Sequence, residues 1–223
     1  KYTIKMKAKK ALLGLLMAIA MLASISTEAS VVTSNTGFTL VEDFEGFDGL
    51  VTRGPTGING GGIVTSDVYS TLGAFAVDLV NNGTWGAGNK FAGIGDLSFV
   101  PTTNEGYVGN MTFTLGAPVL GVGALFSIYN DGNVSGEVTI EALGTGNSVL
   151  ESSTFVIDFN DAGLNNAGLF YGFDRASADI VGLRVSGDGF VLDNLSVKAV
   201  PVPPAFLLML SGIFGVFGHR RKK

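Results

Sequence analysis

Short apolar runs separated by glycine, asparagine, aspartate and serine fill the middle of this chain, and they leave little room for any fold except an all-β one. The 33 glycines are spread through the 223 residues. No stretch between the two ends shows the 3.6-residue apolar repeat of an amphipathic helix. Many short strands with turn residues between them are typical of a sandwich or barrel, so parallel α/β architecture is disfavoured.

Two segments give the clearest strand signal. In 137–142 every second residue is apolar, and 110–115 repeats the pattern with Met111 and Phe113 among the residues predicted to face inward. Alternation of this kind predicts strands with one buried and one exposed face. The other predicted strands are 38–44, 62–65, 74–80, 119–129, 149–157, 169–173, 179–185 and 190–197.

The run 119–129 is apolar at nearly every position and predicts a central strand buried on both sides. The turn residues 130–133 predict a hairpin that joins it to the strand at 137–142. The segments 54–62 and 81–89 lack a strand signal and are expected to be surface loops.

Charge is divided sharply along the chain. Five lysines lie in the first ten residues and four cations in the last four, so 30–199 holds only five basic residues against 18 acids, a formal charge near −13. Such a surface repels phosphate backbones and argues against nucleic-acid binding. The chain has no cysteine, and its one histidine, His219, lies in the tail. Disulfides, thiolate chemistry and Ser-His-Asp triads are therefore excluded.

The first 29 residues have the order of a secretory signal peptide. A lysine-rich start is followed by an apolar run at 11–23 and by small polar residues, with a cleavage site after Ala29. The alternative, an N-terminal membrane anchor, is weaker because 13 apolar residues are too few to span a bilayer.

The last 24 residues, 200–223, combine a proline cluster, an uncharged apolar run at 205–218 and a basic end. A helix over 203–219 would measure about 25 Å at ~1.5 Å per residue, a short span for a bilayer core of about 30 Å. The basic end predicts a cytoplasmic terminus and an external domain. The alternative is a buried C-terminal core helix with a frayed basic tip.

This order of features resembles the PEP-CTERM sorting signal of Gram-negative bacteria, in its VPxPA-like variant without the glutamate. The resemblance implies recognition by a membrane-embedded exosortase, cleavage near the proline motif, and delivery to the cell surface or extracellular matrix. The residues that carry the sorting motif are Val200, Pro201, Val202, Pro203 and Pro204. Those of the basic stop are Arg220, Arg221, Lys222 and Lys223.

A second resemblance lies at the end of the domain. The segment 187–197 is similar to the GxGFxIDNxxF ending of jelly-roll domains that precede such tails, and 41–45 is similar to their first strand. The matching residues are Gly187, Gly189, Phe190, Leu192, Asp193, Asn194 and Val197. The fold expected for 30–199 is a jelly-roll-like antiparallel β-sandwich, flanked by a signal helix at 1–29 and a transmembrane helix within 200–223.

Asp193 stands where strand alternation places an apolar side chain, on the predicted face of Val191, Leu195 and Val197. A buried carboxylate needs partners. One interpretation is a Ca²⁺ ligand, completed by acids near the first strand, Asp43 and Glu45, or Glu42. The other is a bulge, or a carboxylate that accepts backbone N–H groups. The sequence leaves both open and requires no cofactor.

Three further patterns are weaker. Trp85, in a glycine- and asparagine-rich segment, is either a platform for stacking a sugar ring or a plug at the sandwich edge. The acidic cluster that begins at Glu42 and ends at Asp48 is a poor candidate for a glycosidase pair. The segment 158–163 begins like a calcium loop but lacks its later ligands, so a turn is favoured.

These observations predict an exported, non-enzymatic surface or matrix protein associated with extracellular polysaccharide. Its expected partners are an exosortase-type enzyme, the membrane and a polysaccharide. A carbohydrate-binding module, stabilised by calcium in one version, is the alternative, and a glycoside hydrolase has the least support.

Overall fold

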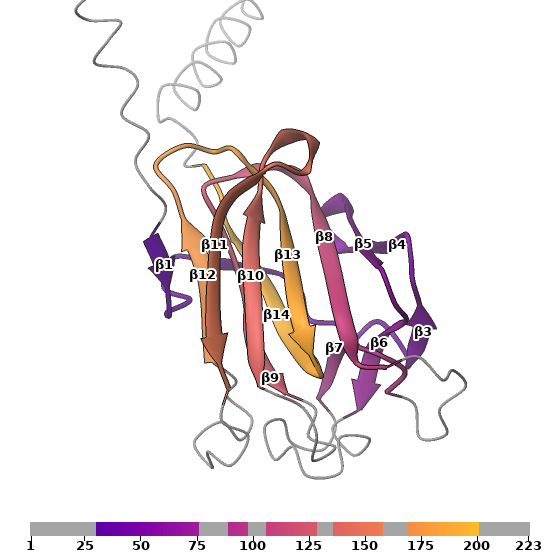
Figure 1. Cartoon of the computed structure of the whole chain (residues 1–223). Helices are drawn as coiled ribbons and strands as arrows, with labels where there is room; N and C mark the ends of the chain where they lie inside the picture. Colours follow the sequence, from indigo (N-terminus) through magenta and orange to yellow (C-terminus); the bar gives the residue numbers. More distant parts are fainter. Residues whose placement is uncertain (1–29, 76–88, 98–105, 129–135, 158–168, 201–223) are drawn as a thin grey trace, which may run out of the picture.

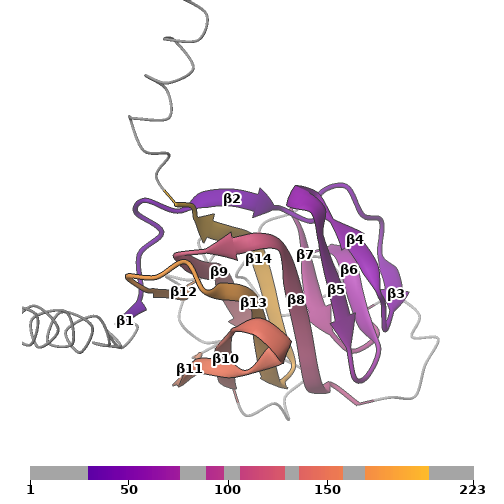
Figure 2. The same ribbon diagram turned by 90° about the horizontal axis from the view of Figure 1, so that it is seen from above.

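The computed structural model describes residues 30–75, 89–97, 106–128, 136–157 and 169–200. In these residues the chain forms two antiparallel β-sheets packed face to face (Figures 1 and 2). No α-helix occurs in these ranges; two short 3₁₀ turns, η1 (Asn59–Gly61) and η3 (Thr145–Asn147), are the helical elements present there. The prediction of an all-β sandwich is confirmed.

The larger sheet has eight strands in the order β1-β12-β9-β14-β7-β6-β3, with β2 paired to the end of β14. Its strands are β1 (Ser30–Val32), β2 (Thr39–Glu42), β3 (Leu50–Thr52), β6 (Ser70–Phe75), β7 (Lys90–Ile94), β9 (Gly121–Ile128), β12 (Leu169–Asp174) and β14 (Phe190–Lys198).

The smaller sheet has six strands in the order β11-β10-β13-β8-β5-β4. Its strands are β4 (Thr56–Ile58), β5 (Gly62–Ser66), β8 (Val108–Val119), β10 (Glu137–Leu143), β11 (Val149–Val156) and β13 (Ile180–Asp188).

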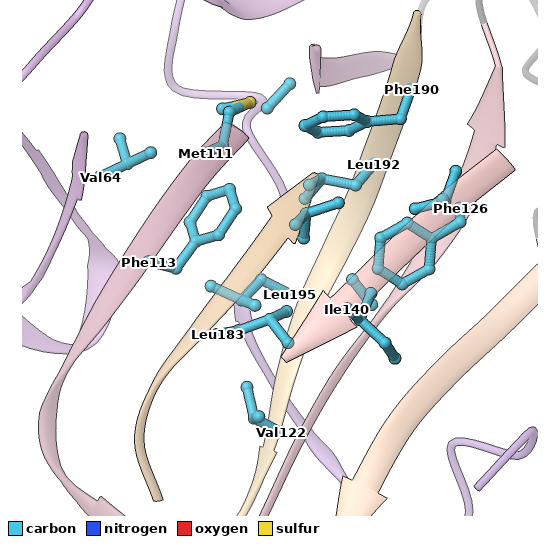
Figure 3. Packing of buried hydrophobic residues seen from close by; sticks show 14 of the residues in the cluster. Val64, Met111, Phe113, Val122, Phe126, Ile140, Leu183, Phe190, Leu192 and Leu195 are labelled. Atoms are coloured by element: carbon cyan, nitrogen blue, oxygen red, sulfur yellow. The ribbon is translucent and has the colours of Figure 1, made fainter. Parts of the chain in front are cut away.

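The core lies between the two sheets, where large apolar side chains from both interdigitate (Figure 3). Met111 and Phe113 of β8 are fully buried, as are Val138 and Ile140 of β10. Period-two alternation therefore predicted the inward face of both strands correctly. Burying each such side chain contributes roughly 1.5–3 kcal/mol.

Two sequence predictions about topology are wrong. The strands at 119–129 and 137–142 do not form a hairpin, because β9 belongs to the larger sheet and β10 to the smaller one. β9 is apolar on both faces and takes β12 and β14 as its two neighbours, so it has no free side for β10. The predicted loop at 54–62 instead contains β4 and η1 and runs into β5.

Candidate functional site

Asp193 lies on the face of the larger sheet that points away from the core. Its neighbour Leu192 belongs to the core cluster, whereas Val191 packs in a small second cluster on the opposite face. After Asp193 the pairing of β14 with β9 shifts at a bulge, and Asn194 has a positive φ of 54°. Leu195 then returns to the core. Asp193 shares a face with Val191 as predicted, but the prediction that it shares one with Leu195 is wrong because the bulge resets the alternation.

The Asp193 carboxylate is only 3 % exposed and has two partners. Oδ2 accepts a hydrogen bond from the Asn89 amide at 3.1 Å, and Oδ1 accepts one from the Asn194 backbone N–H at 2.6 Å. Burial raises the pKa of Asp193 to about 6, the two hydrogen bonds oppose that rise, and the charges of Glu45 and Asp43 add to it. The interpretation of Asp193 as a carboxylate at a bulge, accepting a backbone N–H, is confirmed.

Asp43 and Glu45 lie in the turn that follows β2, within electrostatic reach of Asp193. Asp43 accepts the Glu45 backbone N–H at 3.2 Å, and Glu45 accepts the Lys90 backbone N–H at 2.9 Å. The three acids of the calcium hypothesis therefore come to one corner of the sheet. Within the described ranges, however, no group of three or more acidic or histidine side chains has the spacing to hold a metal ion. Calcium binding stays a prediction.

Glu42 has a structural position at the same corner. Its side chain is 2 % exposed, and its two oxygens accept the backbone N–H groups of Phe44 at 2.7 Å and of Asn59 at 2.9 Å. Asp48, the last acid of this cluster, is 87 % exposed and lies 3.5 Å from the Lys90 ammonium. Glu42 and Asp48 are thus bound to different parts of the chain.

A groove beside Asp193, which the sequence interpretation missed, crosses the outward face of the larger sheet. Its floor depends on two close approaches to glycine. A Cβ on Gly123 would lie 2.6 Å from the Phe170 ring, and one on Gly121 would lie 3.0 Å from the Phe38 ring. The two rings meet edge to face with centroids 5.2 Å apart. Glycine at both positions lets the rings lie close against the sheet.

The groove consists of two adjoining hollows of about 280 and 320 Å³ that share Asn35, Leu125 and Phe170. Every lining side chain is uncharged, although the domain as a whole is strongly acidic. Apolar rings beside amide and hydroxyl groups suit a neutral, hydroxylated ligand. The other lining residues are Thr33, Ser34, Phe38, Leu40, Leu169, Tyr171, Asn194 and Ser196.

The sequence carried a partial signal for this groove. Phe170 and Phe173 are three residues apart, so period-two alternation puts their rings on opposite faces of the strand, and one ring must lie on the outward face. Nothing local, however, indicated that residues 33–38 would lie against it.

Several predicted features lie outside the described residues. They are Trp85, the signal peptide at 1–29, the segment 158–163, the sorting-motif residues 201–204 and the basic stop at 220–223. Val200, the first residue of the motif, is described and 51 % exposed. In the ranges that the structure describes, no helix is long and apolar enough to cross a membrane.

A scan against protein-family models finds no match for this chain, and searches of curated proteins and of solved structures find none either.

Proposed function

We propose that this chain is an exported, non-enzymatic protein, held first by a PEP-CTERM-like tail and then sorted to the cell surface or matrix, with a jelly-roll sandwich as its external domain. The strand order supports the jelly-roll class. Of the eight consecutive strands β7 to β14, four lie in each sheet, ordered β7-β14-β9-β12 and β8-β13-β10-β11. That interleaving is the arrangement of two wound Greek keys.

One observation carries the proposal of a tethered domain: both ends of the sandwich lie in one row of the larger sheet. Ser30 pairs with Asp174, Asp174 with Gly121, and Gly121 with Lys198. Three strand spacings of ~4.8 Å put Ser30 and Lys198 about 14 Å apart. The Lys198 ammonium also binds the Asp174 carboxylate at 2.5 Å. Because the first and last strands of the domain end close together, a membrane attachment after Lys198 leaves the rest of the domain free to extend away from the membrane.

In this proposal the exosortase-type enzyme reads 200–204, the apolar run at 205–218 inserts into the membrane, and Arg220 to Lys223 stay in the cytoplasm. The acidic sandwich faces the extracellular polysaccharide, and its charge near −13 makes nucleic acid an unsuitable partner.

The experiment follows the full chain in a Gram-negative host with and without an exosortase that accepts VPxPA-type tails. We expect a membrane-bound precursor without the enzyme, and with it a shortened product at the surface, its ends read by mass spectrometry. Replacing both Pro203 and Pro204 with alanine should block shortening. Pro118→Ala, at an exposed proline of β8, is the matched control. Finding the chain in the cytoplasm with 1–29 uncut would contradict export.

A second candidate, a module that binds a neutral glycan, is favoured by the uncharged groove over Phe38 and Phe170. Isothermal titration calorimetry with neutral and acidic polysaccharides measures binding without using the chain's one tryptophan, Trp85, as the probe. We expect Phe38→Ala to weaken neutral-glycan binding at least about tenfold, roughly 1.4 kcal/mol. Leu50→Ala, at a 44 % exposed residue on the far edge of the same sheet, should bind normally.

The same titration separates the two carbohydrate hypotheses. A loss of binding in Trp85→Ala, with Phe38→Ala unaffected, would place the ligand at the tryptophan and exclude the groove. No saturable response from the unmodified protein to any glycan would contradict both and leave the structural role alone.

A further inference from the structure

The edges of the two sheets are unequal. The edge strands β1, β2, β3 and β4 contain three or four residues each, whereas β11 contains eight and pairs only with β10 in the described part of the chain. Figures 1 and 2 show β11 at the end of the smaller sheet. Short edge strands offer little backbone for pairing, so β11 is the one long edge among these strands.

The hydrogen-bond pattern shows which backbone groups of β11 point outward. The Ile157 N–H donates to the Gly136 carbonyl at 2.9 Å, so these two residues form a hydrogen-bonded pair. In an antiparallel ladder such pairs alternate with non-bonded ones. Thr154 and Thr139 form a non-bonded pair, in keeping with their hydroxyl oxygens being 2.7 Å apart. Ser152, Thr154 and Val156 therefore direct their N–H and C=O groups away from β10.

The outward side of β11 also lacks the charges that commonly protect an edge. Ser152, Thr154 and Val156 are exposed, Val156 by 64 %. The strand's single carboxylate, Glu151, is bound by the Arg175 guanidinium at 2.6 Å. On a domain with 18 acids this is a stretch where two copies can approach without like-charge repulsion.

We propose that β11 pairs antiparallel with β11 of a second copy of this chain, about a two-fold axis that passes between the two Thr154 residues. Thr154 then lies opposite Thr154, and Ser152 lies opposite Val156. The side chains of these three residues lie on one face of the sheet, and their backbone N–H and C=O groups all point away from β10. This register therefore gives each of those backbone groups a partner. The two six-stranded sheets become one continuous sheet, with both cores on the same side of it.

A second copy fits this edge because Ser152, Thr154 and Val156 map onto themselves in the antiparallel register, and because the one carboxylate of β11 is paired with Arg175 on an otherwise acidic domain. In a register displaced by one residue, each residue whose backbone groups point outward would lie opposite a residue whose groups are already bonded to β10. It would also turn one copy's core to the other side of the sheet.

Cysteine cross-linking of the full chain tests this pairing, because the natural sequence has no cysteine. Opposite residues of a hydrogen-bonded pair have Cα atoms about 5.5 Å apart, within the range a disulfide requires. Mild oxidation should give a covalent dimer of Thr154→Cys. It should also join Ser152→Cys to Val156→Cys in a mixture, whereas Ser152→Cys alone should stay monomeric, since its copies lie about 13 Å apart along the strand.

The matched control is Thr114→Cys, at an exposed threonine inside the same sheet on β8. The apolar tail could bring copies together in detergent, but it cannot choose between positions 114, 152 and 154. If Thr154→Cys cross-links no faster than Thr114→Cys, or Ser152→Cys alone links as fast as the mixture, the pairing is overturned. In sedimentation, Thr154→Glu should halve the mass of the associated species and Thr114→Glu should not; an unchanged mass in Thr154→Glu would overturn it too.

Discussion

At the scale of single residues, Asp193 shows what a period-two pattern detects and what it misses. The pattern identified a carboxylate that breaks the apolar run of the last strand. It grouped that carboxylate with Leu195 and Val197, whereas Asp193 lies on the outward face with Val191, against Asn89, and the bulge after it returns Leu195 to the core. A bulge is set by pairing with a partner strand, and one strand's sequence does not contain it.

Asp193→Asn should change the pH dependence of stability. The pKa of Asp193 is about 6 in the folded chain against 3.8 for an ordinary aspartate. The folded state therefore binds the proton more tightly, and ionisation destabilises it as pH rises through 6. Relative to the natural protein, Asp193→Asn should gain up to about 3 kcal/mol of unfolding free energy between about pH 4 and pH 8.

Urea unfolding of both proteins across that range measures the difference, and parallel pH profiles would refute the assignment. Adding Ca²⁺ provides a further test of the Asp193 site. If Asp193 with Asp43 and Glu45 binds Ca²⁺, the ion should stabilise the natural protein at about pH 8 and leave Asp193→Asn unaffected, because ligands stabilise only the state that binds them.

At the scale of elements, strand ends were harder to predict than strand faces. The sequence predicted a strand at 38–44, but β2 ends at Glu42. There the Glu42 carboxylate accepts the backbone N–H of Phe44, whose φ is +56°, and also holds Asn59 at η1. One buried side chain thus ends a strand and ties it to the other sheet's first turn. The tie joins residues 17 positions apart, so a local pattern does not reveal it.

Glu42→Ala should lower the unfolding free energy by about 2–4 kcal/mol, because it leaves the buried Phe44 N–H and the part-buried Asn59 N–H without their acceptor. Glu42→Gln should lose less, since one amide oxygen remains. Urea unfolding measures both. Asp48→Ala, which removes an ion pair whose carboxylate is 87 % exposed, should cost under about 1 kcal/mol. An equal loss in Glu42→Ala and Asp48→Ala would contradict the role assigned to Glu42.

At the scale of the whole molecule, the order of the strands follows from contacts between distant residues. Ser196 of β14 lies between Gly123 of β9 and Leu40 of β2, and the groove forms only because the loop at 33–38 lies over those strands. The exposed edge at β11 likewise depends on the order of strands in the smaller sheet, which leaves β11 at its end. None of these relations has a period or a motif that the sequence displays.

The sequence by itself determined the all-β class, the inward faces of the regular strands, the acidic domain between two basic ends and the absence of disulfides. These properties follow from local alternation and from composition, which need no knowledge of neighbours. Only the tertiary structure decided that β9 and β10 lie in different sheets, that Asp193 faces outward, and that Phe38 and Phe170 floor one groove. Strands pair with segments that are far apart in the chain. Which strands pair depends on how well their side chains are buried on both faces of the sheet, and not on how close they are in sequence.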